Sequence, residues 1–304
     1  MNLIILLFPI SIIIIALFYM VCYVCLWNLF GITLCVLSLL KWISIKPFIM
    51  KINDMIYEYG KDYFDGISRN IRDTFLVKGN RTNTKQAIYL FHPHGICSLT
   101  HAFHINTDST DWPNHNMYSI VSHLFDKIPF ALDLFNDRNH MILSDYDSMK
   151  KGLESGKSIS LFLGNYTEGK YDHDHRITAI VKNRKGIFKM ALETGIPIIP
   201  VLSYGEQSIF KQHHLFGLTE MIYAHTGIQL NCPDWSSIME WMKLYQKPLN
   251  KKIVTYIGDA IEIKKVPAPI PAEINALRDT YMESLRTLYR TTRPDDYEEE
   301  IVLV

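Results

Sequence analysis

Charge of either sign is absent from the first 40 residues of this 304-residue chain. All 31 basic and all 31 acidic side chains lie in the remaining 264 residues, and the formal net charge is zero. A chain without a basic excess lacks the electrostatic signature of a duplex nucleic-acid binder, so no nucleic-acid partner is expected. The chain therefore combines an uncharged apolar block with a domain that has an ordinary polar surface.

Cysteine is also scarce, and three of the five cysteines, Cys22, Cys25 and Cys35, lie in the apolar block. In such surroundings cysteine behaves as a small hydrophobic residue. Cys22 and Cys25 have C-x-x-C spacing, but no second cysteine pair accompanies them, so neither a redox nor a zinc motif is predicted. No disulfide framework is expected in a domain that faces the cytoplasm.

The apolar block runs for 38 residues from Leu3 to Leu40. One helix needs roughly 20 residues to cross the hydrocarbon core of a bilayer, so this length favours a membrane-embedded helical hairpin over residues 1–45. Asn28 and Gly31 offer a turn near its middle. A single long tilted helix is the alternative to the hairpin. A cleavable signal peptide is not expected, because the cationic n-region is missing and the run exceeds the usual ~7 to 15 apolar residues.

Lysine follows the apolar block at positions 41, 46 and 51, with no acidic residue among them. Under the positive-inside rule this places the following domain on the cytoplasmic side of the membrane. Between Ile52 and Phe75 apolar residues recur every three or four positions, which predicts an amphipathic helix. We assign residues 46–80 to this helix and a linker. Packing against the main domain and lying in the lipid interface both stay open.

Residues 81–304 have the pattern of an α/β domain. Short apolar runs bounded by turn residues predict buried strands over residues 87–91, 158–163, 196–202 and 253–257. Helices are expected from Ser144 to Gly156, from Asn183 to Gly195, and from about residue 272 to residue 289. The order strand, helix, strand argues for a mixed, largely parallel sheet flanked by helices.

All twelve histidines lie between His92 and His225, and the most informative pair is in His92-Pro93-His94-Gly95, directly after a predicted strand. Loops that leave the carboxyl ends of strands gather at the ligand crevice of α/β folds. A neutral histidine is the usual general base near pH 7, and it needs a partner. The candidate partner is Glu168, which ends the loop Gly164-Asn165-Tyr166-Thr167-Glu168 after the next predicted strand.

The H-x-H pattern after a strand also opens many metal-hydrolase sites, in which both rings bind zinc. His101, His104 and the run Asp172 to His175 are the available additional ligands, and packed or solvated positions are the alternative interpretation of each. Ile96 and Cys97 stand where such sites continue with an acidic residue and a histidine. We therefore favour histidine base catalysis and expect no metal.

Two further polar segments belong to the same predicted edge. Asn183-Arg184-Lys185-Gly186 surrounds a predicted helix start, where unpaired amides and an arginine fork suit a substrate with several phosphates. A basic surface helix is the alternative. Ser203-Tyr204-Gly205-Glu206 follows another predicted strand, and contact between Glu206 and a ligand stays open.

Together these segments resemble the type 2 diacylglycerol acyltransferase family, with the related monoacylglycerol and wax-alcohol acyltransferases. The resemblance covers roughly residues 80–290 and also includes Tyr281-Met-Glu-Ser-Leu285 in the last predicted helix. It implies a glycerolipid acyltransferase-like fold, with the acyltransferase domain over residues 81–304. Gly164-Asn165 departs from the two adjacent glycines usual in the family, and Tyr166-Thr167 replaces its alanine-rich stretch, so the acceptor preference stays open.

The resemblance implies transfer of a fatty acyl group from acyl-CoA to diacylglycerol, at an endoplasmic-reticulum-type membrane or a lipid droplet. His94, or alternatively His92, is expected to act as the base, with Glu168 orienting its ring. Acyl-CoA is a co-substrate, no other cofactor is expected, membrane lipids are partners, and a homo-oligomer stays open. The expected substrate-binding residues are Pro93, Gly95, Gly164, Asn165, Asn183, Arg184, Lys185, Gly186, Ser203, Gly205 and Glu206.

Several alternatives remain at this point. A monoacylglycerol, a long-chain alcohol or a lysophospholipid as acceptor would keep the mechanism and change the product. A metal-dependent hydrolase built on the H-x-H pair and a catalytically silent membrane scaffold are more distant alternatives.

Overall fold

The computed structural model describes residues 61–79, 86–96, 98, 100–101, 104, 112, 117–122, 141–164, 168, 175–210, 221 and 234–304. The chain divides into two compact units, Met1–Arg69 and Asn70–Val304. The hairpin predicted over residues 1–45 lies outside the described residues. Among the helices that the structure does describe, none combines the length and apolarity needed to cross a bilayer.

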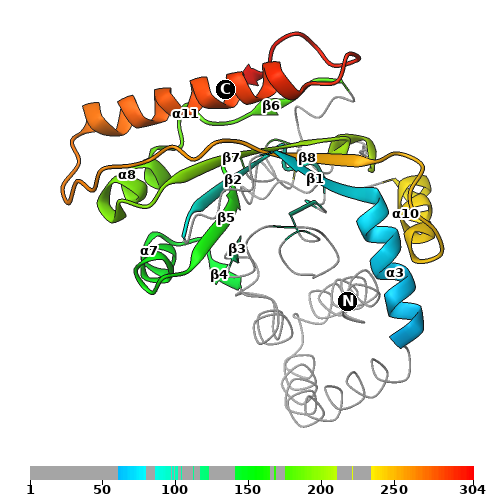
Figure 1. Ribbon diagram of the computed structural model, residues 1–304. Coiled ribbons are helices and arrows are strands. Elements are labelled where there is room, and N and C mark those ends of the chain that lie inside the picture. Colours follow the sequence, from blue (N-terminus) through cyan, green and yellow to red (C-terminus); the bar gives the residue numbers. More distant parts are fainter. Residues whose placement is uncertain are drawn as a thin grey trace. The chain divides into compact units, whose positions relative to one another are not determined.

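The described part of the second unit is built on a seven-stranded sheet with the strand order β1-β8-β7-β2-β5-β3-β4 (Figure 1). All neighbouring strands in it run parallel except β7 and β8, which confirms the predicted mixed, largely parallel sheet. A short parallel pair joins β6 to β9. The strands are β1 Phe75–Gly79, β2 Ile88–His92, β3 Met117–Val121, β4 Met141–Leu143, β5 Ser158–Phe162, β6 Thr178–Ala179, β7 Ile198–Tyr204, β8 Ile253–Ile257 and β9 Val302–Leu303.

The four strands predicted from apolar runs correspond to β2, β5, β7 and β8. β2 and β7 are buried along their whole length, as central strands covered on both faces are. β1, β3 and β4 were not predicted. β1 lies in the segment assigned to a helix and a linker, because Lys78 and Gly79 at its exposed end have the composition of a turn. β4 is only three residues long and offers too short an alternation to recognise.

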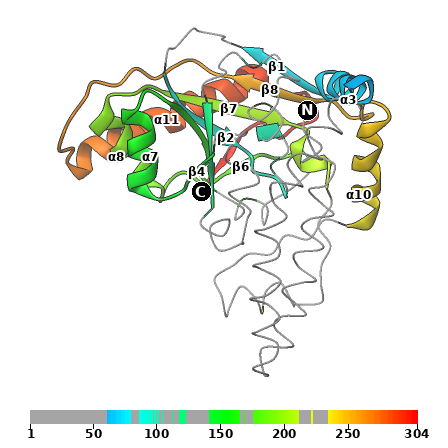
Figure 2. The same cartoon turned by 90° about the horizontal axis from the view of Figure 1, so that it is seen from below.

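The helices of the described residues are α3 Lys61–Thr74, α7 Tyr146–Glu154, α8 Lys185–Thr194, α10 Trp235–Met242 and α11 Pro271–Thr292, with 3-10 turns η2 Glu206–Ser208 and η3 Lys243–Tyr245. α8 and α11 lie along one face of the sheet, and α10 lies at the end where β8 begins (Figure 1 and Figure 2). α11 confirms the predicted last helix.

The predicted helix ends are partly right. Gly195 ends α8 as predicted, in the left-handed conformation with φ of 73°. The two predicted N-caps were wrong. Asp145, one residue after Ser144, caps α7, because its carboxylate accepts a hydrogen bond of 2.7 Å from the Ser148 amide. Arg184 takes the N-cap position of α8 in place of Asn183, without a side-chain capping bond.

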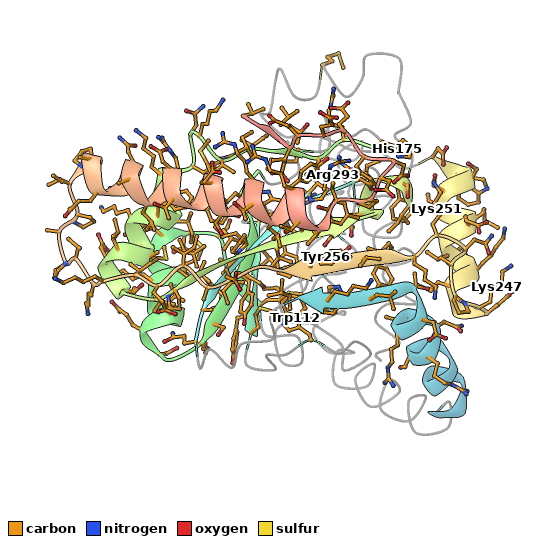
Figure 3. The ribbon with its side chains drawn as sticks, turned by 45° about the horizontal axis from the view of Figure 1, so that its top comes forward. Trp112, His175, Lys247, Lys251, Tyr256 and Arg293 are labelled. Carbon is orange, nitrogen blue, oxygen red and sulfur yellow. The ribbon has the colours of Figure 1, made fainter. Side chains whose placement is uncertain are left out.

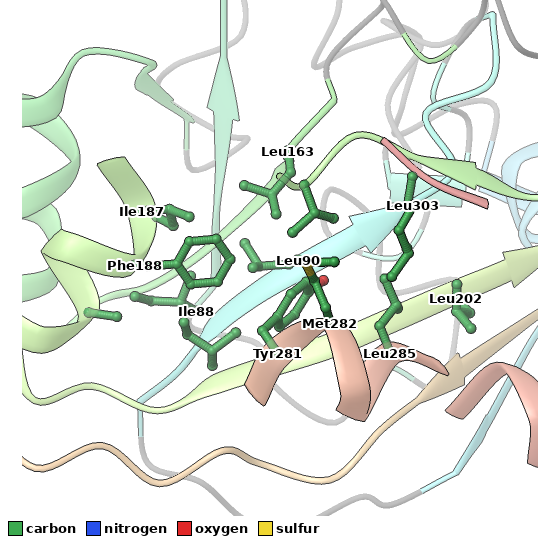
Figure 4. Packing of buried hydrophobic residues seen from close by; sticks show 14 of the residues in the cluster. Ile88, Leu90, Leu163, Ile187, Phe188, Leu202, Tyr281, Met282, Leu285 and Leu303 are labelled. Atoms are coloured by element: carbon green, nitrogen blue, oxygen red, sulfur yellow. The ribbon is translucent and has the colours of Figure 1, made fainter. Parts of the chain in front are cut away.

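The core occupies both faces of the sheet, because successive side chains of each strand point to opposite sides. Tyr89 and Phe91 of β2 pack with Trp112, on the side of the sheet away from α11 (Figure 3). Ile88 and Leu90 belong to the other face, in a cluster with Phe188 of α8, Tyr281 and Leu285 of α11, and Leu303 of β9 (Figure 4). His92 continues the series of Ile88 and Leu90 and therefore points toward the α11 face.

Candidate active site

His92, the last residue of β2, has a fully buried ring with both nitrogens in hydrogen bonds. Nδ1 lies 3.1 Å from Oε1 of Glu168, and Nε2 lies 3.0 Å from the hydroxyl of Tyr281. An ionised carboxylate only accepts hydrogen bonds, so Nδ1 carries a proton and donates it to Glu168. In the neutral ring, Nε2 then accepts from the Tyr281 hydroxyl. The ring is thus held from both ends.

Glu168 joins three segments of the chain although its side chain is almost completely buried. Oε2 accepts a hydrogen bond of 2.9 Å from the amide of His94. Oε1 accepts from the His92 ring and, at 2.9 Å, from the amide of Ile180. Three donors therefore compensate the cost of burying this carboxylate. Gly164 packs directly against it, and a Cβ at this position would overlap with the Glu168 side chain, so only glycine fits.

His94 is half-buried and is held differently from His92. Its Nδ1 lies 2.8 Å from the carbonyl oxygen of Gly95. Because a carbonyl only accepts, Nδ1 carries the proton and Nε2 of the neutral ring keeps its lone pair. No hydrogen-bond partner of Nε2 lies among the described residues. Burial lowers the pKa of His94, although the Gly95 hydrogen bond and the charge of Glu168 oppose this change. The ring also contacts Phe162 edge-on, with centroids 4.7 Å apart.

Glu168 therefore contacts the ring of one of the two candidate bases, His92, and not the ring of the other, His94. Glu168 orients the ring of His92 and the backbone of His94. A backbone carbonyl, that of Gly95, orients the His94 ring. Pro93 joins the two histidines through a cis His92–Pro93 peptide bond.

Glu206 supports the other side of this loop. Its Oε2 accepts a hydrogen bond of 3.0 Å from the amide of Thr100, at the start of the helical residues that follow the loop. A carboxylate at a helix N-terminus satisfies amides that the helix itself leaves unpaired. Gly95 has a φ of 62°, and a Cβ on it would lie 2.9 Å from Cγ of Glu206. The close approach and the left-handed backbone both require glycine.

Ser203 and Gly205 hold the end of β7. The buried hydroxyl of Ser203 lies 3.1 Å from that of Thr255 on β8. Gly205 has a φ of 92°, and its amide donates a hydrogen bond of 3.1 Å to the hydroxyl of Tyr297. Both residues contact the protein core, and their contact with substrate stays a prediction.

The histidines considered as additional metal ligands lie elsewhere. His101 and His104 are buried on the side of the sheet away from α11, with Nε2 2.9 Å from Ser160 Oγ and 2.9 Å from Thr255 Oγ1, respectively. Burial lowers the pKa of each to about 3. His175 pairs with Asp296 at 3.2 Å. Within the part of the chain that the structure describes, no three His, Cys, Asp or Glu side chains come together in a group that could hold a metal ion.

The basic segment Asn183 to Gly186 is exposed at the start of α8. The α8 amides have no side-chain cap from Arg184, so they suit an anion. Ile180, three residues before Asn183, donates its amide to Glu168, which links this segment to the histidine loop. Asn165, the remaining predicted ligand residue, lies outside the described residues.

Tyr281 is the site residue that was not predicted. It lies on the apolar face of the last helix with Leu285, so its spacing marks it only as a core residue. The sequence signal that could have identified it is the tyrosine hydroxyl on this apolar face. A buried tyrosine hydroxyl normally needs a hydrogen-bond partner, which indicates a polar group nearby. Burial raises the pKa of Tyr281 well above its usual value, so the hydroxyl keeps its proton.

Comparison with known proteins gives a family for this arrangement. The family model described as diacylglycerol acyltransferase matches residues 52–299. The chain belongs to the diacylglycerol acyltransferase family. The resemblance carried by five sequence segments predicted this membership, and the family match confirms it. The chain is therefore an acyltransferase.

Relatives of this acyltransferase differ in the acceptor that their names give. It is 26% identical over 263 residues to diacylglycerol O-acyltransferase 2 of Dictyostelium discoideum, covering 78% of this chain and 73% of the relative. It is 27% identical over 250 residues to mouse 2-acylglycerol O-acyltransferase 1, covering 77% and 71%. It is 22% identical over 249 residues to human acyl-CoA wax alcohol acyltransferase 2, covering 73% and 71%. The match to human diacylglycerol O-acyltransferase 2 spans 62% of that protein.

Proposed function

We propose that this acyltransferase moves a fatty acyl group from acyl-CoA to the hydroxyl of diacylglycerol, forming triacylglycerol, with His94 as the general base. The observation that carries the assignment is the hydrogen bond of 2.8 Å between Nδ1 of His94 and the Gly95 carbonyl. It holds the proton on Nδ1 and leaves Nε2 to accept one. Burial also lowers the pKa of His94, so the ring is neutral and able to act as a base at pH 7.

In the proposed reaction, the acceptor hydroxyl attacks the thioester carbonyl while Nε2 of His94 takes its proton. The new C–O bond gives a tetrahedral oxyanion, and its collapse breaks the C–S bond. The leaving CoA thiolate takes the proton from the imidazolium and departs as the thiol. The enzyme returns to its starting state, so the reaction needs no acyl-enzyme, metal or cofactor beyond acyl-CoA.

The loop amides are the candidates for holding the oxyanion. The Ser98 amide already donates to the carbonyl of His94 at 3.1 Å, so the candidates among the described loop residues are the amides of Gly95 and Ile96. One donor of this kind contributes about 3 to 4 kcal/mol in other enzymes.

His92 is assigned as a positioning residue in this mechanism. Both of its nitrogens are engaged, so taking a proton from the substrate would require breaking a buried hydrogen bond to Glu168 or Tyr281. Glu168 positions the His94 backbone through its amide, and its negative charge favours the imidazolium that forms on His94. These hydrogen bonds support the choice of His94 over His92 as the proposed base.

The substrates are assigned from charge and from the apolar block. Arg184 and Lys185 would bind the phosphates of CoA, because they are exposed at an uncapped helix start. The apolar run of residues 1–45 would embed the enzyme in an endoplasmic-reticulum-type membrane, or at a lipid droplet, with the α/β domain on the cytoplasmic side. Diacylglycerol would then enter from the bilayer.

Other acceptors are the second candidates. The relatives named for 2-acylglycerol and for wax alcohols favour a monoacylglycerol or a long-chain alcohol specifically. A lysophospholipid is a further possibility of the same chemistry. All of them use the same base and the same acyl donor, so they differ only in the acceptor pocket.

The test is an acyl-transfer assay on membranes that contain the full chain, with labelled acyl-CoA and each of these acceptors. His94→Asn keeps a nitrogen donor near Nδ1 and removes Nε2, and we expect a loss of roughly 10²- to 10⁴-fold. His175→Asn is the matched control, because His175 is an exposed histidine paired only with Asp296 and Tyr297 in the described structure. Normal product from the His94 variant, or no product from any acceptor, would refute the proposal.

A further inference from the structure

α10 presents three large apolar side chains to solvent. Trp235 is 70% exposed, Met239 is 44% exposed and Met242 is 46% exposed. Their spacings of four and three residues place them on one face of the helix. Single exposed apolar residues are common on soluble surfaces, but a contiguous group marks a contact surface.

A cluster of positive charge follows this apolar face directly. Lys243, Lys247, Lys251 and Lys252 are all exposed, and no acidic residue lies between positions 243 and 252. Only Lys243 among them has an ion-pair partner in the described structure, Glu240. Figure 3 shows Lys247 and Lys251 at the end of the molecule that α10 occupies. An apolar face with tryptophan beside a lysine cluster is the composition of a surface that binds anionic lipid.

The strand register places this surface at the catalytic edge of the sheet. β8 begins directly after the lysine cluster and runs antiparallel to β7, with Val254 opposite Tyr204. β7 runs parallel to β2, with Leu202 opposite His92. The chain therefore enters β8 at the edge where β2 ends and the histidine loop begins. The exposed apolar and basic residues lie at the same edge as the proposed base.

We propose that α10 and the segment Lys243 to Lys252 form a docking surface for an anionic lipid bilayer. Trp235, Met239 and Met242 enter the interface between headgroups and acyl chains, and the lysines pair with the phosphate and carboxylate groups of the lipids. The docked surface holds the edge with His94 against the membrane. This inference rests on the proposed function in one respect. If the acceptor is dissolved in the bilayer, the edge with His94 must face the lipid to reach it.

The direct test uses the fluorescence of Trp235 in the full chain, reconstituted into phosphatidylcholine vesicles with and without phosphatidylserine. The emission of Trp235→Phe is subtracted from that of the wild type, which isolates Trp235 from the other four tryptophans. With phosphatidylserine, we expect this difference emission to shift to shorter wavelength and to be quenched by brominated acyl chains.

Two outcomes overturn the proposal. Emission at the wavelength of tryptophan in water, without quenching, means that the surface stays in solvent. A shift to shorter wavelength without quenching means that another protein surface, such as a second copy of the chain, covers it.

Charge reversal tests the lysines with a matched control. Lys251→Glu with Lys252→Glu should reduce the quenching of Trp235 several-fold in phosphatidylserine vesicles. Lys264→Glu with Lys265→Glu makes the same charge change at two exposed lysines that follow Ile261, which bridges to Ile198 at the other end of β7. The control pair should leave the quenching unchanged, and equal losses from both pairs would refute the assignment of the surface.

Acyl transfer to an acceptor dispersed in detergent is measured alongside, because that reaction does not require docking. Transfer in detergent without quenching in vesicles would reject the docking surface and leave the proposed function standing. Quenching without transfer to any acceptor would support the docking surface and reject the proposed function.

Discussion

Replacing Tyr281 by phenylalanine removes one oxygen atom from the centre of the site and keeps the ring that fills the core. The hydroxyl of Tyr281 lies 3.0 Å from Nε2 of His92, and both side chains are fully buried. The substitution leaves that nitrogen without its donor, and a buried polar atom without a partner costs about 1 to 3 kcal/mol. We expect a lower midpoint of thermal unfolding by several degrees, because a change of this size shifts Tm by roughly 2 to 4 °C per kcal/mol in a domain this large.

The same change should lower kcat more than it alters the KM for acyl-CoA. The His92 ring loses one of its two supports, and Glu168 also holds the amide of His94, so we expect the proposed base His94 to shift with it. Displacements of about 1 Å can cost roughly 10²-fold in rate, and we expect a loss of at least about tenfold. Arg184 and Lys185, the proposed ligands of the CoA phosphates, are unaffected, so the KM for acyl-CoA should stay close to the wild-type value.

Tyr289→Phe is the matched control. Tyr289 lies on the same helix, is also fully buried, and donates its hydroxyl to the carbonyl of Glu298 at 2.6 Å. The Tyr289→Phe variant should lose about as much stability as Tyr281→Phe and retain the wild-type kcat. The measurement compares initial rates across acyl-CoA concentrations and unfolding midpoints for the three proteins. A Tyr281 variant with wild-type kcat would refute the role of the buried network in positioning the base.

Three further predictions concern His94, the pair His101 and His104, and Gly164. Burial lowers the pKa of His94, so the midpoint of the acid limb of kcat/KM should lie below about pH 6.5, the ordinary value for histidine; a midpoint above it would contradict the assignment. Burial also lowers the pKa values of His101 and His104 to about 3 in the folded chain, so the unfolded chain binds more protons between about pH 3 and 6.5. Stability should therefore be fully present above that window and fall by about 1.4 kcal/mol per pH unit for each histidine as the pH drops through it, and His101→Gln should remove half of this slope in pH-dependent unfolding. Gly164→Ala should displace Glu168 and lower both kcat and the unfolding midpoint, whereas Gly66→Ala, with no atom within 4 Å of the added Cβ, should do neither.

The central part of the fold was accessible from sequence because its strands are buried on both faces. β2 and β7 form continuous apolar runs, and the rule that ligand loops follow the carboxyl ends of strands brings His92, His94 and Glu168 to one edge. The edge strand β4 was missed because its three residues are too short a run for recognition.

The different hydrogen bonding of His92 and His94 was not accessible from the sequence. It depends on Tyr281, 189 residues away along the chain, and on a carbonyl whose position is set by the backbone of the loop. Glu206 shows a related limit. Its place after a strand suggested a contact with a ligand, which stays a prediction, but no pattern near Glu206 reveals that its carboxylate accepts a hydrogen bond from the amide of Thr100.

The carbonyl of Gly95 has a consequence for how this site tolerates change. In an arrangement where a carboxylate fixes the tautomer of a catalytic histidine, replacing that one side chain frees the proton to move to the other nitrogen. Here the acceptor belongs to the main chain, and no substitution can delete it, because every amino acid brings the same carbonyl. What variation can damage is the course of the loop, which depends on the left-handed backbone at Gly95 and on the packing of its neighbours. A substitution that changes the backbone at position 95 should therefore turn the His94 ring, even though it removes no side chain that contacts the ring through a hydrogen bond.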